Sequence, residues 1–251
     1  ESQSWTDAEL VGGILNRYCG TDQQDVDIYT LYAEQPYTVS MPSPPYDDFT
    51  EVNVGTTAST FYEKNVKVES NLNHQPVEIT QWQGVPTSYV WDKESHYPIA
   101  KAKGAYSNEL FYTSFEDNGE SGTSSSSART GEKVKAISTE YSIPFTFQNG
   151  DYLITYYWRA GESYTWTLRK ESVNGTSFQT DEDSGQIDEL RVHPADALMT
   201  TYTYDPLIGK TSETDPNGRT TYYEYDSLGR LVKVCDHDEN ILQEYEYNYA
   251  Q

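Results

Sequence analysis

The C-terminal part of this chain repeats a tyrosine-rich motif, and this repeat limits the possible folds more than any other feature. Tyr204-Asp205, Tyr225-Asp226 and Tyr247-Asn248 recur at spacings of 21 and 22 residues. In each unit, Tyr-x-Tyr-Asp is followed by Gly and then by a turn that begins with Asp. A second Gly is expected within this turn, but the second unit has Glu239-Asn240 at that place. Side chains at i and i+2 share one face of a strand, and Asp accepts hydrogen bonds within its own turn. The repeat therefore predicts short antiparallel strands that add to one sheet.

The composition predicts an ordered, β-rich protein. The 251 residues include 23 Tyr, 7 Phe and 5 Trp, far more aromatic than a disordered acidic chain, and Tyr, Thr and Val favour strands. The net charge of −23 offers no basic surface for nucleic acid or for an anionic membrane. No apolar run is long enough to span a bilayer. We therefore expect neither a nucleic-acid partner nor direct membrane insertion.

A short helix is predicted near the N-terminus. Thr6-Asp7-Ala8-Glu9 has the form of a capping box, and Leu10–Leu15 carries an apolar stripe at helical spacing. Met41–Pro45 contains three prolines, which predicts an extended arm. The helix and the arm make up a first region, residues 1–50.

From residue 51 the apolar period changes to two, which is typical of strands. Residues 51–103 contain three such segments, at 61–69, 77–82 and 88–91, and form a second, YD-like β region. Further strands, separated by turn residues, are predicted at 134–139, 152–159, 164–170 and 187–193. Short strands at this spacing predict a β-sandwich over residues 104–196, and the repeats fill residues 197–251.

The sequence predicts no enzyme. The four histidines have no ligand spacing, and no catalytic or nucleotide-binding motif is present. The two cysteines, Cys19 and Cys235, either form a pair or are two separate buried thiols.

The segment Tyr222-Tyr-Glu-Tyr-Asp-Ser-Leu-Gly-Arg-Leu231 closely resembles the YD repeats of RHS proteins, and the resemblance extends over residues 199–249. Members of that family build long sheets that spiral into hollow shells around a toxin cargo. Two and a half units are too few to close a shell, so the resemblance implies a terminal sheet with a structural role. Ser88–Trp91 followed by Tyr97–Ala100 resembles large RHS-like surface proteins of the Bacteroidota, some of which use type 9 secretion. That resemblance implies an extracellular or cell-surface location at the outer membrane.

Residues 104–194 interrupt the repeats and resemble carbohydrate-binding modules with a galactose-binding-like β-jelly roll. The similar motifs occur in order at 114–119, 128–131, 150–158 and 187–192. The expected fold is therefore all-β: a jelly-roll β-sandwich inserted between YD-repeat strands, with a short N-terminal helix.

The jelly-roll resemblance implies a structural calcium ion between the first and last strands. Glu116 and Asp188, with Asp117 nearby, would supply oxygens, which calcium prefers. The alternative is that these carboxylates cap turns or are solvated.

Sugar binding is the second activity that such modules imply. Trp158, Tyr164 and Trp166 are candidates, and Tyr156 would share a face with Trp158 because the two are separated by two positions on a strand. The alternative is that these rings pack between sheets.

Together these features predict a non-enzymatic, secreted or cell-surface RHS/YD-repeat protein with a structural or interaction role, associated with type 9 secretion or surface-adhesin machinery. Its expected partners are proteins at the outer membrane or cell surface, or the upstream part of a larger chain. Two alternatives remain: a carbohydrate-binding adhesin that binds a glycan, and the C-terminal part of a larger RHS toxin-like polypeptide.

Overall fold

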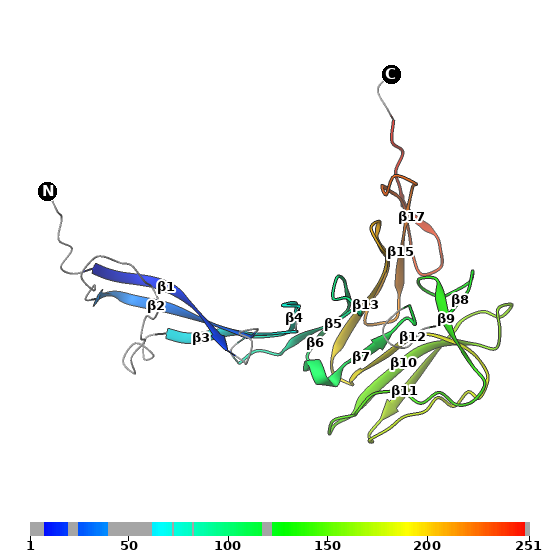
Figure 1. Ribbon diagram of the computed structural model, residues 1–251, viewed down its shortest axis with the longest axis horizontal. Coiled ribbons are helices and arrows are strands. Elements are labelled where there is room, and N and C mark those ends of the chain that lie inside the picture. Colours follow the sequence, from blue (N-terminus) through cyan, green and yellow to red (C-terminus); the bar gives the residue numbers. More distant parts are fainter. Residues whose placement is uncertain are drawn as a thin grey trace. The chain divides into compact units, whose positions relative to one another are not determined.

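The computed structural model describes residues 8–19, 25–39, 62–71, 73–81, 83–116 and 122–248 (Figure 1). The chain divides into two compact units, Glu1–Gly84 and Val85–Gln251. The described residues contain strands, one short 3-10 helix and no α-helix, which confirms the all-β prediction. Within them, no helix has the length and apolar character needed to cross a membrane.

In its described residues, the first unit contains four antiparallel strands that pair in chain order. They are β1 (Ala8–Cys19), β2 (Asp25–Val39), β3 (Tyr62–Ser70) and β4 (Pro76–Gln81). Strands β3 and β4 lie within one residue of the two segments predicted there.

The predicted N-terminal helix is wrong from residue 8 onward, because β1 pairs with β2 along its whole length. Two glycines, Gly12 and Gly13, lie in the middle of this segment, and glycine lowers helix stability by about 1 kcal/mol per residue. The capping signal at Thr6 is local and lies outside the described residues. Pairing with the next strand in the chain therefore outweighs a short helical pattern. The proline-rich arm at 41–45 also lies outside the described residues.

The second unit contains a sheet that we call the repeat sheet. Its strands, all antiparallel and in spatial order, are β5 (Thr87–Trp91), β6 (Pro98–Lys103), β13 (Leu198–Asp205), β14 (Gly209–Thr214), β15 (Thr220–Tyr225), β16 (Leu231–Cys235) and β17 (Ile241–Glu244). Ala100 pairs with Thr201 and Lys103 with Leu198, so β6 and β13 are neighbours. The chain between them leaves this sheet and returns to it. On β16, Cys235 is a buried, free thiol.

The chain between β6 and β13 forms a second antiparallel sheet, which we call the insert sheet. It comprises β7 (Phe111–Thr113), β8 (Thr123–Ser124), β9 (Lys133–Ile137), β10 (Tyr152–Arg159), β11 (Thr167–Val173) and β12 (Gly185–Pro194), preceded by the 3-10 helix η2 (Ser107–Glu109). The spatial order is β11-β10-β12-β9-β8, and β7 also pairs with β12. Strand β10 has the bounds predicted from the sequence.

The apolar core of the insert lies on one face of this sheet. Phe115, Ile154 and Leu190 are fully buried there. Ile143 and Phe147, from the segment between β9 and β10, cover them. A second, smaller core joins β6 and β13 to the beginning of the insert, through Ala102, Met199 and Tyr112 among others.

Within the described residues, five turns are capped by their first side chain; in four of them it bonds the N–H groups two and four residues later, and in the Asp92 turn those four and five residues later. In each turn the side-chain oxygen of the first residue accepts two backbone N–H groups from farther along the turn. The first residues are Asn71, Asp92, Asp215, Asp226 and Asp236. The predicted Asp-capped turns of the repeat are therefore confirmed, and two similar turns precede them in the chain.

Candidate functional site

A bulge in β12 turns two charged side chains toward the repeat sheet. Glu189 has a positive φ of 54°, and the register between β10 and β12 shifts beside it. Ile187 points into the apolar core, and simple alternation would place Glu189 there as well. The extra residue instead places Leu190 and Val192 in the core. Glu189 and Arg191 consequently lie on the opposite face.

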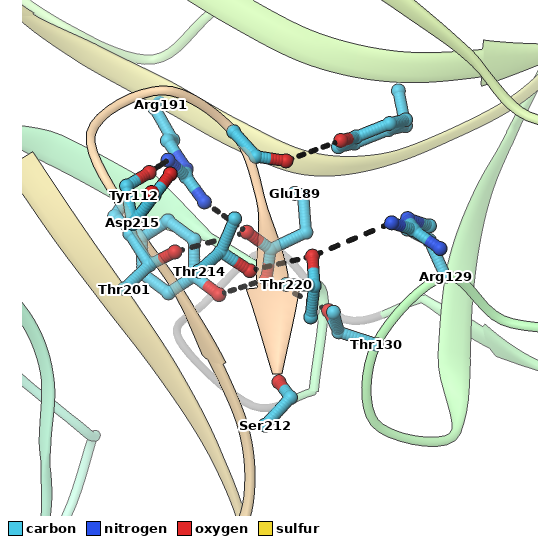
Figure 2. Close-up of polar contacts among 12 residues, drawn as sticks. Tyr112, Arg129, Thr130, Glu189, Arg191, Thr201, Ser212, Thr214, Asp215 and Thr220 are labelled. Atoms are coloured by element: carbon cyan, nitrogen blue, oxygen red, sulfur yellow. Dashed lines mark hydrogen bonds and ion pairs between the residues drawn. The ribbon is translucent and has the colours of Figure 1, made fainter. Parts of the chain in front are cut away.

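The carboxylate of Glu189 is the centre of a buried polar network (Figure 2). Its Oε1 accepts hydrogen bonds from the Tyr112 hydroxyl at 2.6 Å and from Thr130 Oγ1 at 2.7 Å. Its Oε2 accepts from Thr201 Oγ1 and from Arg191 Nη2, both at 3.0 Å. Thr201 belongs to the repeat sheet and the other donors to the insert. One carboxylate therefore joins the two sheets.

The electrostatics of the network favour an ionised Glu189 beside a neutral Tyr112. Burial acts to raise the pKa of Glu189, but Arg191 and the hydroxyl groups of Tyr112 and Thr130 outweigh it, so this pKa is lower than usual. Burial and the adjacent Glu189 raise the pKa of the Tyr112 hydroxyl well above its usual value. The hydroxyl therefore keeps its proton and remains a donor to the carboxylate.

Two side chains of the insert sheet also donate hydrogen bonds to backbone carbonyls in one turn of the repeat sheet. Arg191 Nη1 donates to the carbonyl of Asp215 at 3.0 Å, and the Tyr157 hydroxyl donates to the carbonyl of Gly218 at 2.8 Å. Asp215 begins this turn and Gly218 ends it. The turn between β14 and β15 is thus fixed at both ends by the insert.

Arg129 makes a second connection between the sheets. Its guanidinium lies over the rings of Tyr157, at 4.8 Å, and Tyr222, at 5.5 Å from the ring centroids. Its Nη2 contacts His237 Nδ1 at 2.6 Å and Thr220 Oγ1 at 3.4 Å. Its Nε is buried without a hydrogen-bond partner in the described part of the chain. The loop that carries Arg129 therefore reaches from the insert to the repeat strands.

Asp188 and Glu116, the two predicted calcium ligands within the described residues, accept hydrogen bonds from backbone N–H groups of the loop that carries Arg129. Asp188 is fully buried and accepts from the N–H groups of Arg129 at 2.9 Å, Thr130 at 3.1 Å and Glu189 at 2.7 Å. Burial, and then the charge of Glu189, raise the pKa of Asp188 well above its usual value.

Glu116 Oε1 holds the other end of the loop, accepting from the N–H groups of Glu132 and Lys133, both at 2.8 Å. Asp117 lies outside the described residues. Among those described, no group of three or more His, Cys, Asp and Glu residues could hold a metal ion. The calcium site stays a prediction, and the observed contacts agree with the alternative in which the carboxylates cap backbone turns.

A groove of about 690 Å³ lies where the insert meets the repeat strands. The insert contributes Tyr164, Trp166 and Arg159 to its lining, and the same loop contributes Arg129. Tyr222 and Tyr223 of β15 line the side formed by the repeat sheet. Two of the four predicted sugar-binding residues, Tyr164 and Trp166, are therefore brought together in this groove.

The other two predicted sugar-binding residues lie elsewhere. Tyr156 is 1% exposed in the apolar core, and its hydroxyl donates to Glu182 at 2.6 Å. Trp158 packs against the same core and lies under the guanidinium of Arg169, at 4.8 Å from the ring centroid. The shared face that the sequence predicted for this pair is thus the core face. Tyr156 offers no surface to a ligand.

The network around Glu189 was not predicted from the sequence. One sequence feature could have indicated it. Three of the four residues at 188–191 are charged, namely Asp188, Glu189 and Arg191, although they lie in a strand with apolar neighbours. Charged residues are rarely buried unless they are paired, so such a run indicates either a bulge or a polar contact on the far face.

One family of known proteins matches part of the repeat sheet. No curated protein matches the chain at a significant level. The family described as RHS Repeat matches residues 209–234, which span β14, β15 and most of β16. The chain therefore carries an RHS repeat, and Arg191 and Tyr157 of the insert bind the turn between its strands β14 and β15.

Proposed function

We propose that this protein is a non-enzymatic structural component in which an RHS-type sheet carries a β-rich insert in one fixed orientation. The observation that supports this most directly is Glu189, a buried carboxylate with donors from both sheets. Apolar contacts alone tolerate sliding, whereas a buried and fully hydrogen-bonded ion pair is directional. Removing one member of such a pair leaves an uncompensated charge, so alternative orientations are costly.

The proposed location is the cell surface, with export across the outer membrane. The RHS repeat at 209–234 and the resemblance of the upstream segments to surface proteins support this location. Association with type 9 secretion is the finer form of the proposal. A longer RHS polypeptide that includes this chain is a further possibility, which the mass of the protein isolated from its native cell would decide.

The proposed partner is a protein that adds to the edge of the repeat sheet. Strand β17 is the last strand of the sheet in the described part of the chain. Its Ile241 and Leu242 are 56% and 58% exposed. An unpaired edge with apolar side chains is a template for another strand.

Cross-linking on intact cells tests this proposal. A membrane-impermeant cross-linker should capture the protein together with a surface protein, and the double variant Ile241→Lys plus Leu242→Lys should abolish the capture. Leu207→Lys is the matched control, because Leu207 is 98% exposed in a turn away from that edge. Protection of the protein from the reagent, or unchanged capture by the double variant, would contradict the proposal.

The second candidate function is a carbohydrate-binding adhesin. The observation that favours it is the placement of Tyr164 and Trp166 in one groove with hydroxyl and guanidinium groups. Aromatic rings with a few polar groups are the usual composition of sugar sites.

A further inference from the structure

We propose that the groove between the insert and the repeat strands binds an acidic saccharide, with the sugar ring against Tyr164 and Trp166 and its carboxylate near Arg129 and Arg159. This proposal goes beyond the structural role, since a fixed orientation of the insert requires no ligand. It rests on the second candidate function, the carbohydrate-binding adhesin, and adds the chemical class of the ligand in that groove.

The size and lining of the groove suit one or two sugar rings. Its volume of about 690 Å³ lies within the range of about 300–1,000 Å³ that is typical of small-molecule sites. Ser126, Ser127 and Thr211 also line it. Hydroxyls and rings together match the polar rim and the apolar face of a pyranose.

The two insert aromatics differ in how firmly they are held. The Trp166 ring lies under the Arg159 guanidinium, at 4.2 Å from the ring centroid, and its Nε1 donates to the Ser127 carbonyl at 3.1 Å. Tyr164 is 64% exposed, and within the described residues its hydroxyl has no hydrogen-bond partner. Trp166 is thus a fixed platform, and the Tyr164 ring and hydroxyl are available to a ligand.

The charge of the groove is unusual for this protein. Arg159 is 2% exposed and donates only to neutral groups, including Gln186 Oε1 at 2.7 Å, Ser127 Oγ at 2.9 Å and Ser125 Oγ at 3.2 Å. Within the described part of the chain, neither Arg129 nor Arg159 forms an ion pair with a carboxylate. The whole chain has 40 acidic and only 17 basic residues. Two guanidinium groups without a carboxylate partner in so acidic a chain indicate that an anion completes the site.

Burial increases the free-energy cost of leaving Arg159 without a counter-ion. Desolvation lowers the pKa of Arg159, although the charges of Glu162 and Asp188 oppose the effect. A buried charge without a hydrogen-bonded counter-ion destabilises a folded protein. A ligand carboxylate would be attracted by the charge of Arg159 without contacting it, and its charge-assisted hydrogen bonds, which are about twice as strong as neutral ones, would come from Arg129.

The carboxylates that line the groove do not replace this anion. Glu224 forms an ion pair with Lys233 at 2.6 Å. Glu162 and Glu239 are exposed, and water and salt screen exposed charges far more than buried ones. None of these three lining carboxylates therefore forms an ion pair with Arg129 or Arg159 in the described part of the chain.

Calorimetric titration of the full chain with three probes tests the proposal. The probes are tetragalacturonate, the same tetrasaccharide with its carboxyl groups reduced to alcohols, and a tetraglutamate peptide. Tetragalacturonate should bind at least about tenfold more tightly than either of the other two, since it alone offers both a pyranose face and carboxylates. Equal binding of the reduced sugar would overturn the assignment of an acidic ligand. Equal binding of the peptide would overturn the assignment of a saccharide.

Two variants locate the binding. Tyr164→Ala should weaken tetragalacturonate binding about tenfold without changing the melting temperature, because the side chain is exposed. Tyr106→Ala, which removes a Tyr that is 52% exposed and outside the groove, should leave binding unchanged. Unchanged binding by Tyr164→Ala, or no binding of tetragalacturonate to the intact protein, would overturn the proposal. Neither result would affect the structural role, which depends on Glu189.

Discussion

Glu189 and Arg191, two positions apart on β12, form a buried ion pair at 3.0 Å, and each reaches a different strand or turn of the repeat sheet. Glu189 accepts from Thr201 on β13, and Arg191 donates to the carbonyl of Asp215 after β14. Because both side chains come from one strand of the insert, any rotation of the insert over the repeat sheet would break both contacts together. The pair therefore couples the position of the insert to the shape of the RHS repeat.

Replacing Glu189 with Gln should strongly destabilise the second unit. Gln has the same shape but leaves the buried Arg191 without a counter-ion, which typically costs about 3–5 kcal/mol. Urea unfolding followed by intrinsic fluorescence would measure the loss. The control is Glu213→Gln, which breaks a more exposed ion pair with Lys210 in the same sheet and should cost less than about 1 kcal/mol. Equal losses in the two variants would show that the network does not join the sheets.

Replacing Glu239 with Gly should stabilise the repeat sheet. Glu239 occupies the fourth position of its turn with φ of 65°, where Gly218 and Gly229 stand in the two preceding turns. A left-handed backbone costs a non-glycine residue about 1–2 kcal/mol, so relief of this strain should raise the melting temperature.

The reverse substitution, Gly229→Ala, is the control for Glu239→Gly. A Cβ at Gly229 would meet nothing within 4 Å, so the only expected effect is backbone strain and a lower melting temperature. Opposite shifts in the two variants confirm that the turn geometry repeats. Shifts in the same direction would contradict it.

These turns also show how far the sequence could predict the fold. The Asp-capped turns of the repeat and the strand at 152–159 follow from local sequence patterns, and both were predicted correctly. The turns at Asn71 and Asp92 use His74 and Ser95 at the positive-φ position. Both turns have a positive φ at the position of the repeat's glycine, although neither residue is a glycine.

The features that the sequence did not predict depend on contacts between separate strands. Residues 8–19 carry a helical pattern, yet their partner strand begins at Asp25 and pairs with them along the whole length. The direction of Glu189 depends on a one-residue bulge, which reverses the alternation of every later side chain in the strand. Tyr156 and Trp158 were correctly placed on one face, but only the packed structure shows that this face is the core.

The stability of the second unit should fall in mildly acidic solution because of His193. This residue is buried, and burial lowers the pKa of its imidazole below the usual 6.5, a shift that Arg191 and Lys170 reinforce. The unfolded chain then binds a proton at a higher pH than the folded one, so His193 contributes stability above about pH 6.5 that is lost as the pH falls below it.

His193→Asn retains a donor near the Pro194 carbonyl, which Nδ1 contacts at 2.8 Å in the wild type. The variant should lose stability less steeply than the wild type between pH 6.5 and more acidic values. Denaturant unfolding at a series of pH values gives the two slopes, and identical slopes would contradict the assignment.

Asp188 provides a test that separates backbone capping from calcium binding. Asp188→Ala removes the acceptor of three backbone N–H groups, and leaving buried donors unsatisfied costs about 1–3 kcal/mol. If capping is the role of this carboxylate, the variant should lose the same stability in calcium and in EDTA, since no metal takes part. Asp183→Ala is the control, because Asp183 is exposed and accepts only from the adjacent Ser184 hydroxyl. A destabilisation that appears only when calcium is present would instead support the calcium site, with Asp117 as a further ligand, because calcium would then stabilise the wild type alone.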